Sequence, residues 1–140
     1  CQVPLMVTGG FRTRSVMDDV LSSDKLDMIG LGRPLCTDPD TPRELIEGRI
    51  DQAVAHEKDL KLAKRGLFSP ASPVTPLKAV NVLGSLAWYY QQLFRLADGK
   101  SPKLNMGVLQ AFSAYMADEL SSAMRVRRAE RRLTREKNAV

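Results

Sequence analysis

The sequence has little of what metal centres, disulfide scaffolds and membrane anchors require. It contains two cysteines and one histidine among 140 residues, which excludes a disulfide framework and a four-ligand metal site. No run of 18 apolar residues occurs, and no basic segment followed by an apolar stretch opens the chain. The sequence therefore predicts no transmembrane helix and no secretion, and it favours a protein of the reducing cytoplasm.

What is present is an ordinary globular composition with its charge excess at one end. Hydrophobic residues make up 44% and charged residues 26% of the chain, as is typical of a globular domain large enough for a real core. Residues 1–124 hold 14 basic and 14 acidic residues, which cancel, whereas residues 125–140 hold seven basic and two acidic residues. The whole net charge of +5 therefore belongs to the C-terminal tail.

The first third of the chain shows a strand–helix–strand pattern. Residues 3–8 form a short apolar run, which predicts a strand buried on both faces. Residues 13–23 carry apolar positions at helical spacing, and residues 27–31 form a second apolar run. Because the three segments follow one another within about 30 residues, we expect a βαβ unit with parallel strands.

The middle of the chain contains a predicted helix start, a charged segment and a predicted linker. Thr41, Pro42 and Glu44 have the spacing of a capping box, which predicts a helix with Thr41 as its N-cap that runs to about Gly48. Residues 52–64 are rich in charge and are expected to form a second helix. Residues 66–76 contain three prolines and are predicted to be a linker.

The remainder is predicted to be helical, with two apolar stripes that step by three and four residues. The first stripe comprises Val80, Leu83, Ala87, Tyr90, Phe94 and Ala97, and the second comprises Leu109, Phe112, Met116, Leu120 and Ala123. Asp98 and Gly99 separate the two helices. The expected organisation is thus an α/β part at residues 1–65, a linker at 66–76 and a helical extension with a basic tail at 77–140.

Two glycine turns follow the two predicted strands. Gly9 and Gly10 end the first apolar run, and Gly32 with Arg33 ends the second. Ligands of parallel α/β folds bind at this end of the strands, where the loops converge and the N-terminus of the next helix offers N–H donors. Glycine lets backbone amides approach an anion closely, and an arginine binds two phosphate oxygens at once. From spacing alone, a phosphate site and a pair of ligand-free turns both remain open.

The motifs around these turns resemble those of a known enzyme family. VTGGFRT, followed by DMIGLGRPLCTDPDTPREL, resembles the end of the old yellow enzyme family of FMN-dependent NAD(P)H oxidoreductases. The resemblance covers residues 3–48 with specific motifs and extends more loosely through residues 87–100. FMN oxidases of 2-hydroxy acids share both glycine turns, but the Asp-Pro-Asp-x-Pro segment at residues 38–42 favours the old yellow enzyme group.

This resemblance implies a fold and an activity. Residues 3–8 and 27–31 would be strands 7 and 8 of a TIM (β/α)8 barrel, so the chain would hold the last two βα units and a mostly helical C-terminal extension. The parent enzyme would use NADH or NADPH to reduce a small molecule with an activated C=C bond or a carbonyl. The family's catalytic His/His or His/Asn pair and Tyr lie on earlier strands. The chain is therefore expected to be a fragment without catalytic residues, inactive alone and prone to oligomerise through open strand edges.

The resemblance also implies a cofactor site. In the family, backbone N–H groups at the positions of Gly9, Gly10 and Gly32 hold the FMN phosphate. The position of Arg33 contributes its backbone and its side chain, and Phe11 lies beside the edge of the flavin ring. No cysteine follows Cys36, so the chain does not resemble the larger members that carry an iron–sulfur cluster.

Five further residues are interpreted structurally. His56 is expected to be a solvated surface histidine, and Cys36 a small loop residue in preference to a reactive thiol. Trp88, Tyr89 and Tyr90 could form a stacking platform for nucleobases, but at the start of an apolar helix they are interpreted as packing residues.

The basic tail supports an alternative function. A non-enzymatic helical module could use the seven basic residues of the tail to bind nucleic acid, an acidic partner or an anionic membrane surface. The tail lacks interleaved aromatic residues and a clear apolar face. A solvated helix end, stabilised by basic charge at a helix C-terminus, is therefore favoured, and nucleic acid is not expected as a partner.

Overall fold

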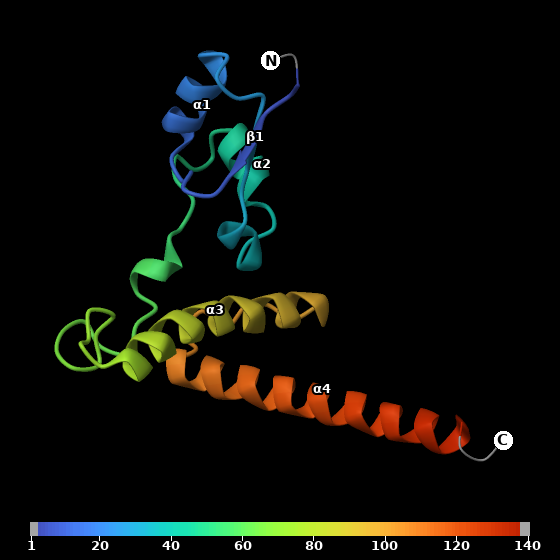
Figure 1. Ribbon diagram of the computed structural model, residues 1–140. Coiled ribbons are helices and arrows are strands. Elements are labelled where there is room, and N and C mark those ends of the chain that lie inside the picture. The colour runs from blue at the N-terminus through green and yellow to red at the C-terminus, as the bar shows by residue number, and fades with distance from the viewer. Residues whose placement is uncertain (1–2, 138–140) are drawn as a thin grey trace. The chain divides into compact units, whose positions relative to one another are not determined.

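The structure is a computed structural model that describes residues 3–137. The chain divides into two compact units, one of residues up to 60 together with 92–105, the other of residues 61–91 together with 106 onwards. Figure 1 labels the main elements. In chain order they are β1 (Met6–Thr8), α1 (Arg14–Ser22), β2 (Met28–Gly30), a 3₁₀ turn at Arg33–Cys36, α2 (Thr41–Ile46), a 3₁₀ turn at His56–Lys58, α3 (Thr75–Ala97) and α4 (Val108–Lys137).

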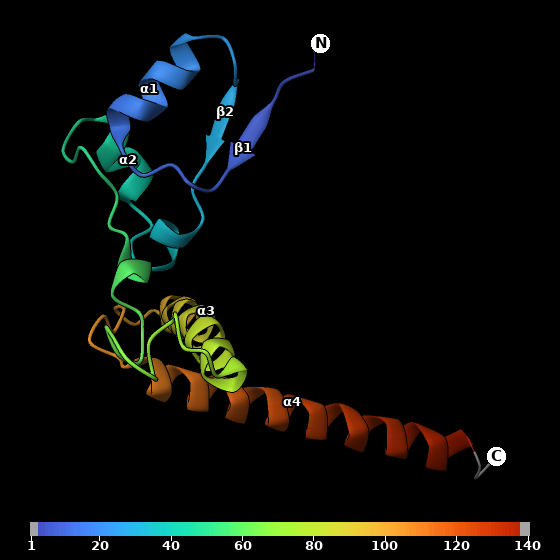
Figure 2. The same cartoon turned by 60° about the vertical axis from the view of Figure 1, so that its left-hand side comes forward.

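The strand–helix–strand prediction is confirmed in order and in direction. β1 and β2 pair in parallel, with Thr8 opposite Gly30, and α1 connects them (Figure 2). A Cβ atom added at Gly30 would overlap the Thr8 hydroxyl and the Met6 side chain. The lack of a side chain at Gly30 therefore leaves room for these two side chains of β1.

The expectation that the first strand, at residues 3–8, is buried on both faces is wrong for the described chain. Met6 and Met28, which face each other in the register, are 54% and 57% exposed. The reason is physical: a parallel strand is buried by neighbouring strands and by helices on both faces, whereas residues 3–137 form a sheet of two strands. The TIM barrel, which needs six further strands, stays a prediction.

The core of the first unit lies where α1, α2 and a returning segment meet. Met17, Leu45 and Ala53 are its buried members, with partly buried apolar side chains around them that are Phe11, Ile29, Leu31 and Ile50. These residues come from five different segments, so burial of their side chains is what brings the segments together.

The predicted helix at residues 52–64 is wrong. Gln52 forms an isolated antiparallel bridge with Thr13, and Ala53 N–H donates to the carbonyl of Arg12 at 2.8 Å. The backbone groups that would start a helix are therefore bonded across the chain, and the one helical turn in this segment is His56–Lys58. Pairing with a distant segment has overridden local helix propensity.

The predicted start of α2 is shifted by one residue. Thr41 is the first helical residue and not the N-cap, which is Asp40. Asp38 holds the loop before the helix: its carboxylate accepts from Asp40 N–H at 3.0 Å and from the Thr41 hydroxyl at 3.2 Å. The helix ends at Ile46, close to the predicted end at Gly48.

In the second unit, the buried face of α3 differs from the predicted stripe. Asn81, Gly84 and Trp88 are buried, whereas Leu83 and Tyr90 are exposed. Asn81 is satisfied in the interior, because its side chain accepts from Leu62 N–H and donates to two carbonyls, those of Phe68 and Leu77. A polar residue at a buried position is what an apolar pattern cannot reveal.

The helices α3 and α4 approach each other closely at Gly84. A Cβ atom there would overlap the Val108 side chain, so glycine permits the approach. Trp88 is fully buried, and its indole N–H donates to the carbonyl of Met106 at 3.0 Å. The predicted stripe on α4 is also wrong, since Val108 and Ala111 are buried while Leu109 and Leu120 are exposed.

Candidate functional site

The loops that follow β1 and β2 line one cavity of about 330 Å³ within the first unit. All five residues predicted to hold a cofactor line it, namely Gly9, Gly10, Phe11, Gly32 and Arg33. The remaining lining residues are Thr8, Arg12, Gly30, Leu31 and Glu57. Parallel pairing of the strands places both loops at the same edge of the sheet, which is why residues 20 positions apart share a cavity.

The first glycine turn has the backbone conformation that glycine favours. Gly9 has a φ of +102° and Gly10 a φ of +82°, and residues with a side chain rarely adopt such values. Gly9 N–H donates to the carbonyl of Gly30 at 3.4 Å, so this amide extends the ladder between β1 and β2. The turn thus links the end of the sheet to the cavity.

Gly32 is glycine for a different reason. Its φ of −103° is open to other residues, and a Cβ atom added to it would meet no atom within 4 Å among the described residues. Neither backbone strain nor packing within residues 3–137 therefore requires glycine there. The space in front of Gly32 opens on the cavity, where a side chain would block the close approach of a ligand to the backbone.

Two charged residues of the cavity were not predicted from the sequence. Glu57 Oε1 lies 2.8 Å from Arg12 Nη2 and 3.5 Å from Arg33 Nη1. One carboxylate thus faces the guanidinium groups of both glycine loops. Arg12 could have been found, because it directly follows the Gly-Gly-Phe turn. Glu57 has no sequence signal, because it lies in a segment that reads as an ordinary charged helix.

Arg12 has a buried donor without an acceptor. The Nε atom of its guanidinium is inaccessible to solvent and forms no hydrogen bond within residues 3–137. An unsatisfied buried donor costs about 1–3 kcal/mol, and such groups are rare in folded proteins. The Arg12 guanidinium contacts Glu57 through Nη2, while its Nε stays unpaired among the described residues.

The start of α1 is bonded to the returning segment, and no residue of α1 lines this cavity. Arg14 N–H donates to the carbonyl of Asp51 at 2.8 Å, and Met17 N–H donates to the carbonyl of Thr13 at 3.2 Å. The returning segment at residues 51–53 therefore uses the start of α1. The site depends instead on the glycine turns and on the arginine side chains.

The other residues considered from the sequence have structural roles. Burial raises the pKa of the Cys36 thiol, an effect only partly opposed by a backbone hydrogen bond, so the thiol stays protonated at neutral pH. Trp88 and Tyr89 are buried in edge-to-face contact with ring centroids 5.2 Å apart, which confirms their interpretation as packing residues. Tyr90 is partly exposed, and His56 is half-buried rather than fully solvated.

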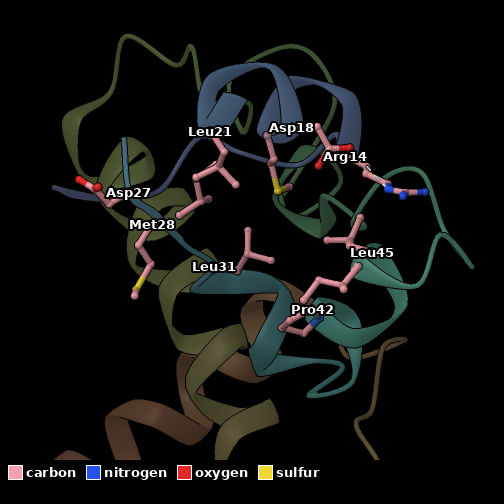
Figure 3. A pocket seen from close by; sticks show the side chains of 11 residues that line it. Arg14, Asp18, Leu21, Asp27, Met28, Leu31, Pro42 and Leu45 are labelled. Carbon is pink, nitrogen blue, oxygen red and sulfur yellow. Dashed lines mark ion pairs between the residues drawn. The ribbon is translucent and has the colours of Figure 1, made fainter. Parts of the chain in front are cut away.

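A second cavity of about 270 Å³ lies between α1, β2 and α2 (Figure 3). The side chains of Leu21, Leu31 and Leu45 converge on it. Its polar rim includes Arg14 and Asp18, whose side chains lie 3.6 Å apart. The lining is mostly apolar, and its charged members are Arg14, Asp18 and Asp27.

Two kinds of site are absent from the part of the chain that the structure describes. Within residues 3–137, no three side chains of His, Cys, Asp or Glu gather closely enough to hold a metal ion. No helix formed by these residues combines the length and the apolar character that crossing a bilayer demands.

Comparison with known proteins gives one informative relationship. No protein-family model matches the chain, and no solved structure matches it. A curated protein of Talaromyces variabilis, "NADH-dependent flavin oxidoreductase iccE", is 33% identical over 96 residues, which are 68% of this chain and 22% of that protein. The chain therefore spans about a fifth of the length of this relative. It is a distant relative of part of a flavin oxidoreductase, which supports the predicted parentage in its general form.

Proposed function

We propose that this chain is the cofactor-anchoring, C-terminal part of an FMN-dependent NAD(P)H oxidoreductase of the old yellow enzyme type. The observation that carries the proposal is the convergence of both glycine turns, Arg33 and Arg12 on one cavity. The similarity to part of a flavin oxidoreductase supports it independently. In the parent, β1 and β2 would be the last two strands of a barrel, whose loops after strands 7 and 8 commonly bind phosphate.

The residues of the cavity fit the phosphate of FMN. Two arginines against one glutamate leave the cavity with one net positive charge. Arg33 is 61% exposed at its side chain and can turn toward a ligand. The open space at Gly32 admits an oxygen close to the backbone.

Each residue has a defined part in this proposal. The backbone at Gly10 and Gly32 would surround the phosphate, whereas Gly9, whose N–H donates to Gly30, would shape the turn. Arg33 would pair with two of the phosphate oxygens. Phe11 lines the cavity while packing against the core of the first unit, so its ring is held in place for contact with the flavin edge. When bound, FMN supplies hydride transfer from NADH or NADPH to a small molecule with an activated C=C bond or a carbonyl.

The catalytic groups that act on the substrate would lie in the rest of the parent protein, which would work in the cytoplasm. This chain would contribute binding and orientation, and the chain alone would be inactive. The same proposal includes a homo-oligomeric parent as one way to cover the exposed residues of β1 and β2, the other being further strands of the parent.

The experiment is reconstitution of the full-length parent with FMN. Replacing Arg33 by Ala removes a charge-assisted contact worth about 1.5–3 kcal/mol, so FMN affinity should fall by about 10- to 100-fold. Arg43→Ala is the matched control, because Arg43 is an exposed arginine on α2 that pairs with Asp40 outside the cavity. A parent that purifies without flavin, or an Arg33→Ala variant that retains full FMN affinity, would refute the proposal.

The alternative, a helical module that recruits nucleic acid or an acidic partner through its tail, has less support. Arg125 bonds to Ser121 and Ser122 on its own helix, as expected of a solvated helix surface. The alternative predicts binding that weakens steeply with salt. Undetectable binding of the 140-residue chain to DNA, RNA and anionic vesicles at low salt would eliminate it.

A further inference from the structure

The carboxylate of Glu57 is an unusual group to find in a cavity suited to phosphate. It reaches the cavity from the 3₁₀ turn at His56–Lys58, a different segment from either glycine loop. It contacts Arg12 and Arg33 through the same oxygen, Oε1. A carboxylate placed between the two cations of an anion site occupies the position that a ligand oxygen would take.

We propose that Glu57 is an internal counter-ion that competes with the ligand phosphate for Arg33 and so lowers the affinity of the site for phosphorylated flavins but not for unphosphorylated ones. This inference rests on the proposed function, because it takes the cavity to be the FMN phosphate site. In the ligand-free site, Glu57 holds the two like-charged guanidinium groups together. On binding, the phosphate replaces Glu57 at Arg33, whereas Glu57 keeps its contact with Arg12.

The two ion pairs differ in the way that this exchange requires. The Arg12–Glu57 pair is short, at 2.8 Å, and its side chains are 16% and 26% exposed. The Arg33–Glu57 contact is longer, at 3.5 Å, and the Arg33 side chain is 61% exposed. Ion pairs that are open to solvent contribute little, whereas short and shielded pairs are held more firmly. Arg33 is therefore the partner that can be exchanged.

The exchange depends on the charge of the ligand. A phosphomonoester carries a charge of about −1.5 to −2 and three strong acceptor oxygens, so it outcompetes a single carboxylate for a guanidinium. A neutral hydroxyl terminus, such as the ribityl end of riboflavin, cannot displace the carboxylate from the guanidinium. Glu57 thus lowers the affinity for phosphorylated ligands by the free energy of the contact that is lost, while leaving unphosphorylated flavins unaffected.

The test is a comparison of FMN and riboflavin binding to the full-length parent with and without Glu57→Gln. Glutamine keeps an oxygen acceptor for Arg12 and removes the charge that competes at Arg33. FMN affinity should rise about two- to fivefold, the fold-change that corresponds to an exposed ion pair, and riboflavin affinity should stay the same. Glu47→Gln is the matched control, because Glu47 pairs with Arg49 away from the cavity.

A double variant isolates the contact. In an Arg33→Ala background, Glu57→Gln should no longer tighten FMN binding, because the contested partner is gone. Unchanged or weaker FMN affinity in Glu57→Gln would overturn the inference, as would an equal shift for FMN and riboflavin. If Glu57→Gln does not fold, Glu57→Asp provides the measurement: it keeps the charge, withdraws it from Arg33 and should tighten FMN binding about twofold, with no effect on riboflavin. Unchanged FMN affinity in Glu57→Asp would then overturn the inference.

The failure of this inference can be told from failure of the proposed function. If Arg33→Ala weakens FMN binding and Glu57→Gln does not strengthen it, only the role of Glu57 is refuted. If Arg33→Ala has no effect on FMN binding, the cavity is not the phosphate site and both proposals fall.

Discussion

Arg12 Nη2 and Glu57 Oε1 lie 2.8 Å apart although the two residues are separated by 45 positions in the sequence. The contact joins the loop after β1 to the segment of Glu57, which follows the return of the chain past α1 at residues 51–53. Bonds between backbone groups bring that segment back, through Arg14 N–H to Asp51 and Ala53 N–H to Arg12. The geometry of the cavity therefore depends on a chain return that lies far from either glycine turn.

Replacement of Arg12 by Met should destabilise the first unit by about 1–2 kcal/mol, because Glu57 would lose its short, partly buried partner. The measurement is urea unfolding of the variant and of the unmodified chain. Arg43→Met is the control, since Arg43 is exposed and its pair with Asp40 is long, at 3.3 Å. It should change stability by less than about 0.5 kcal/mol. Equal stabilities for the two variants would show that the Arg12–Glu57 contact contributes nothing.

The two glycine turns should respond differently to alanine. Gly32→Ala should leave stability unchanged, because φ is −103° and the added Cβ meets no described atom, but it should weaken FMN binding about tenfold by filling the space before the backbone. Gly10→Ala should cost about 1–2 kcal/mol of stability, because φ is +82°. Thermal unfolding and FMN titration separate the effects. Full FMN affinity in Gly32→Ala would argue against close approach of a phosphate at this position.

Trp88→Phe should destabilise the second unit by about 1–3 kcal/mol, because the variant loses packing volume and the hydrogen bond from the indole N–H to Met106. Tyr90→Phe, at a partly exposed position of the same helix, should have little effect. Trp88 is the one tryptophan of the sequence, so its fluorescence reports unfolding of the unmodified chain, and circular dichroism serves for the variant. Similar melting temperatures for both variants would contradict the packing role of Trp88.

Cys36 should react slowly with iodoacetamide at neutral pH. Burial raises the pKa of its thiol above the ordinary value of 9.0, so the nucleophilic thiolate is scarce and the midpoint of the rate profile should lie above pH 9. The raised pKa also makes the folding stability depend on pH. The stability contributed by the protonated Cys36 thiol is fully present below the unfolded-state pKa and is lost as the pH rises through the folded-state pKa. Rates measured in a Cys1→Ser background report Cys36 alone. Rapid alkylation at pH 7 would contradict the protonated state.

The features that follow from local chemistry were predictable from the sequence. Apolar runs ending at Gly10 and Gly32 predicted two parallel strands with α1 between them, and the left-handed φ values at Gly9 and Gly10 agree with the choice of glycine. The stop at residues 98 and 99 was also predicted, and α3 ends at Ala97. Each of these depends on periodicity or on backbone preference within a few residues, which the sequence states directly.

The face that a helix buries was less predictable. On α3, an apolar count favoured Leu83 and Tyr90, yet Asn81, Gly84 and Trp88 are buried. Gly84 is buried because a neighbouring helix approaches it. Asn81 is buried because its amide bonds to three backbone groups, those of Leu62 and Phe68 outside α3 and that of Leu77 one turn earlier on α3. Partners of this kind are invisible to a pattern that counts only hydrophobic side chains.

The amino-acid sequence is enough to predict the two glycine turns, the parallel order of their strands and Arg33 as the cation of the second loop. These follow from short-range backbone chemistry, which is the same wherever the segment lies. Long-range contacts, in contrast, make residues 51–53 pair with the first loop instead of forming a helix, and consequently bring Glu57 to face Arg12 and Arg33. Closing a loop of 45 residues requires long-range backbone bonds and shared apolar burial to outweigh lost chain entropy, and that balance belongs to the whole fold.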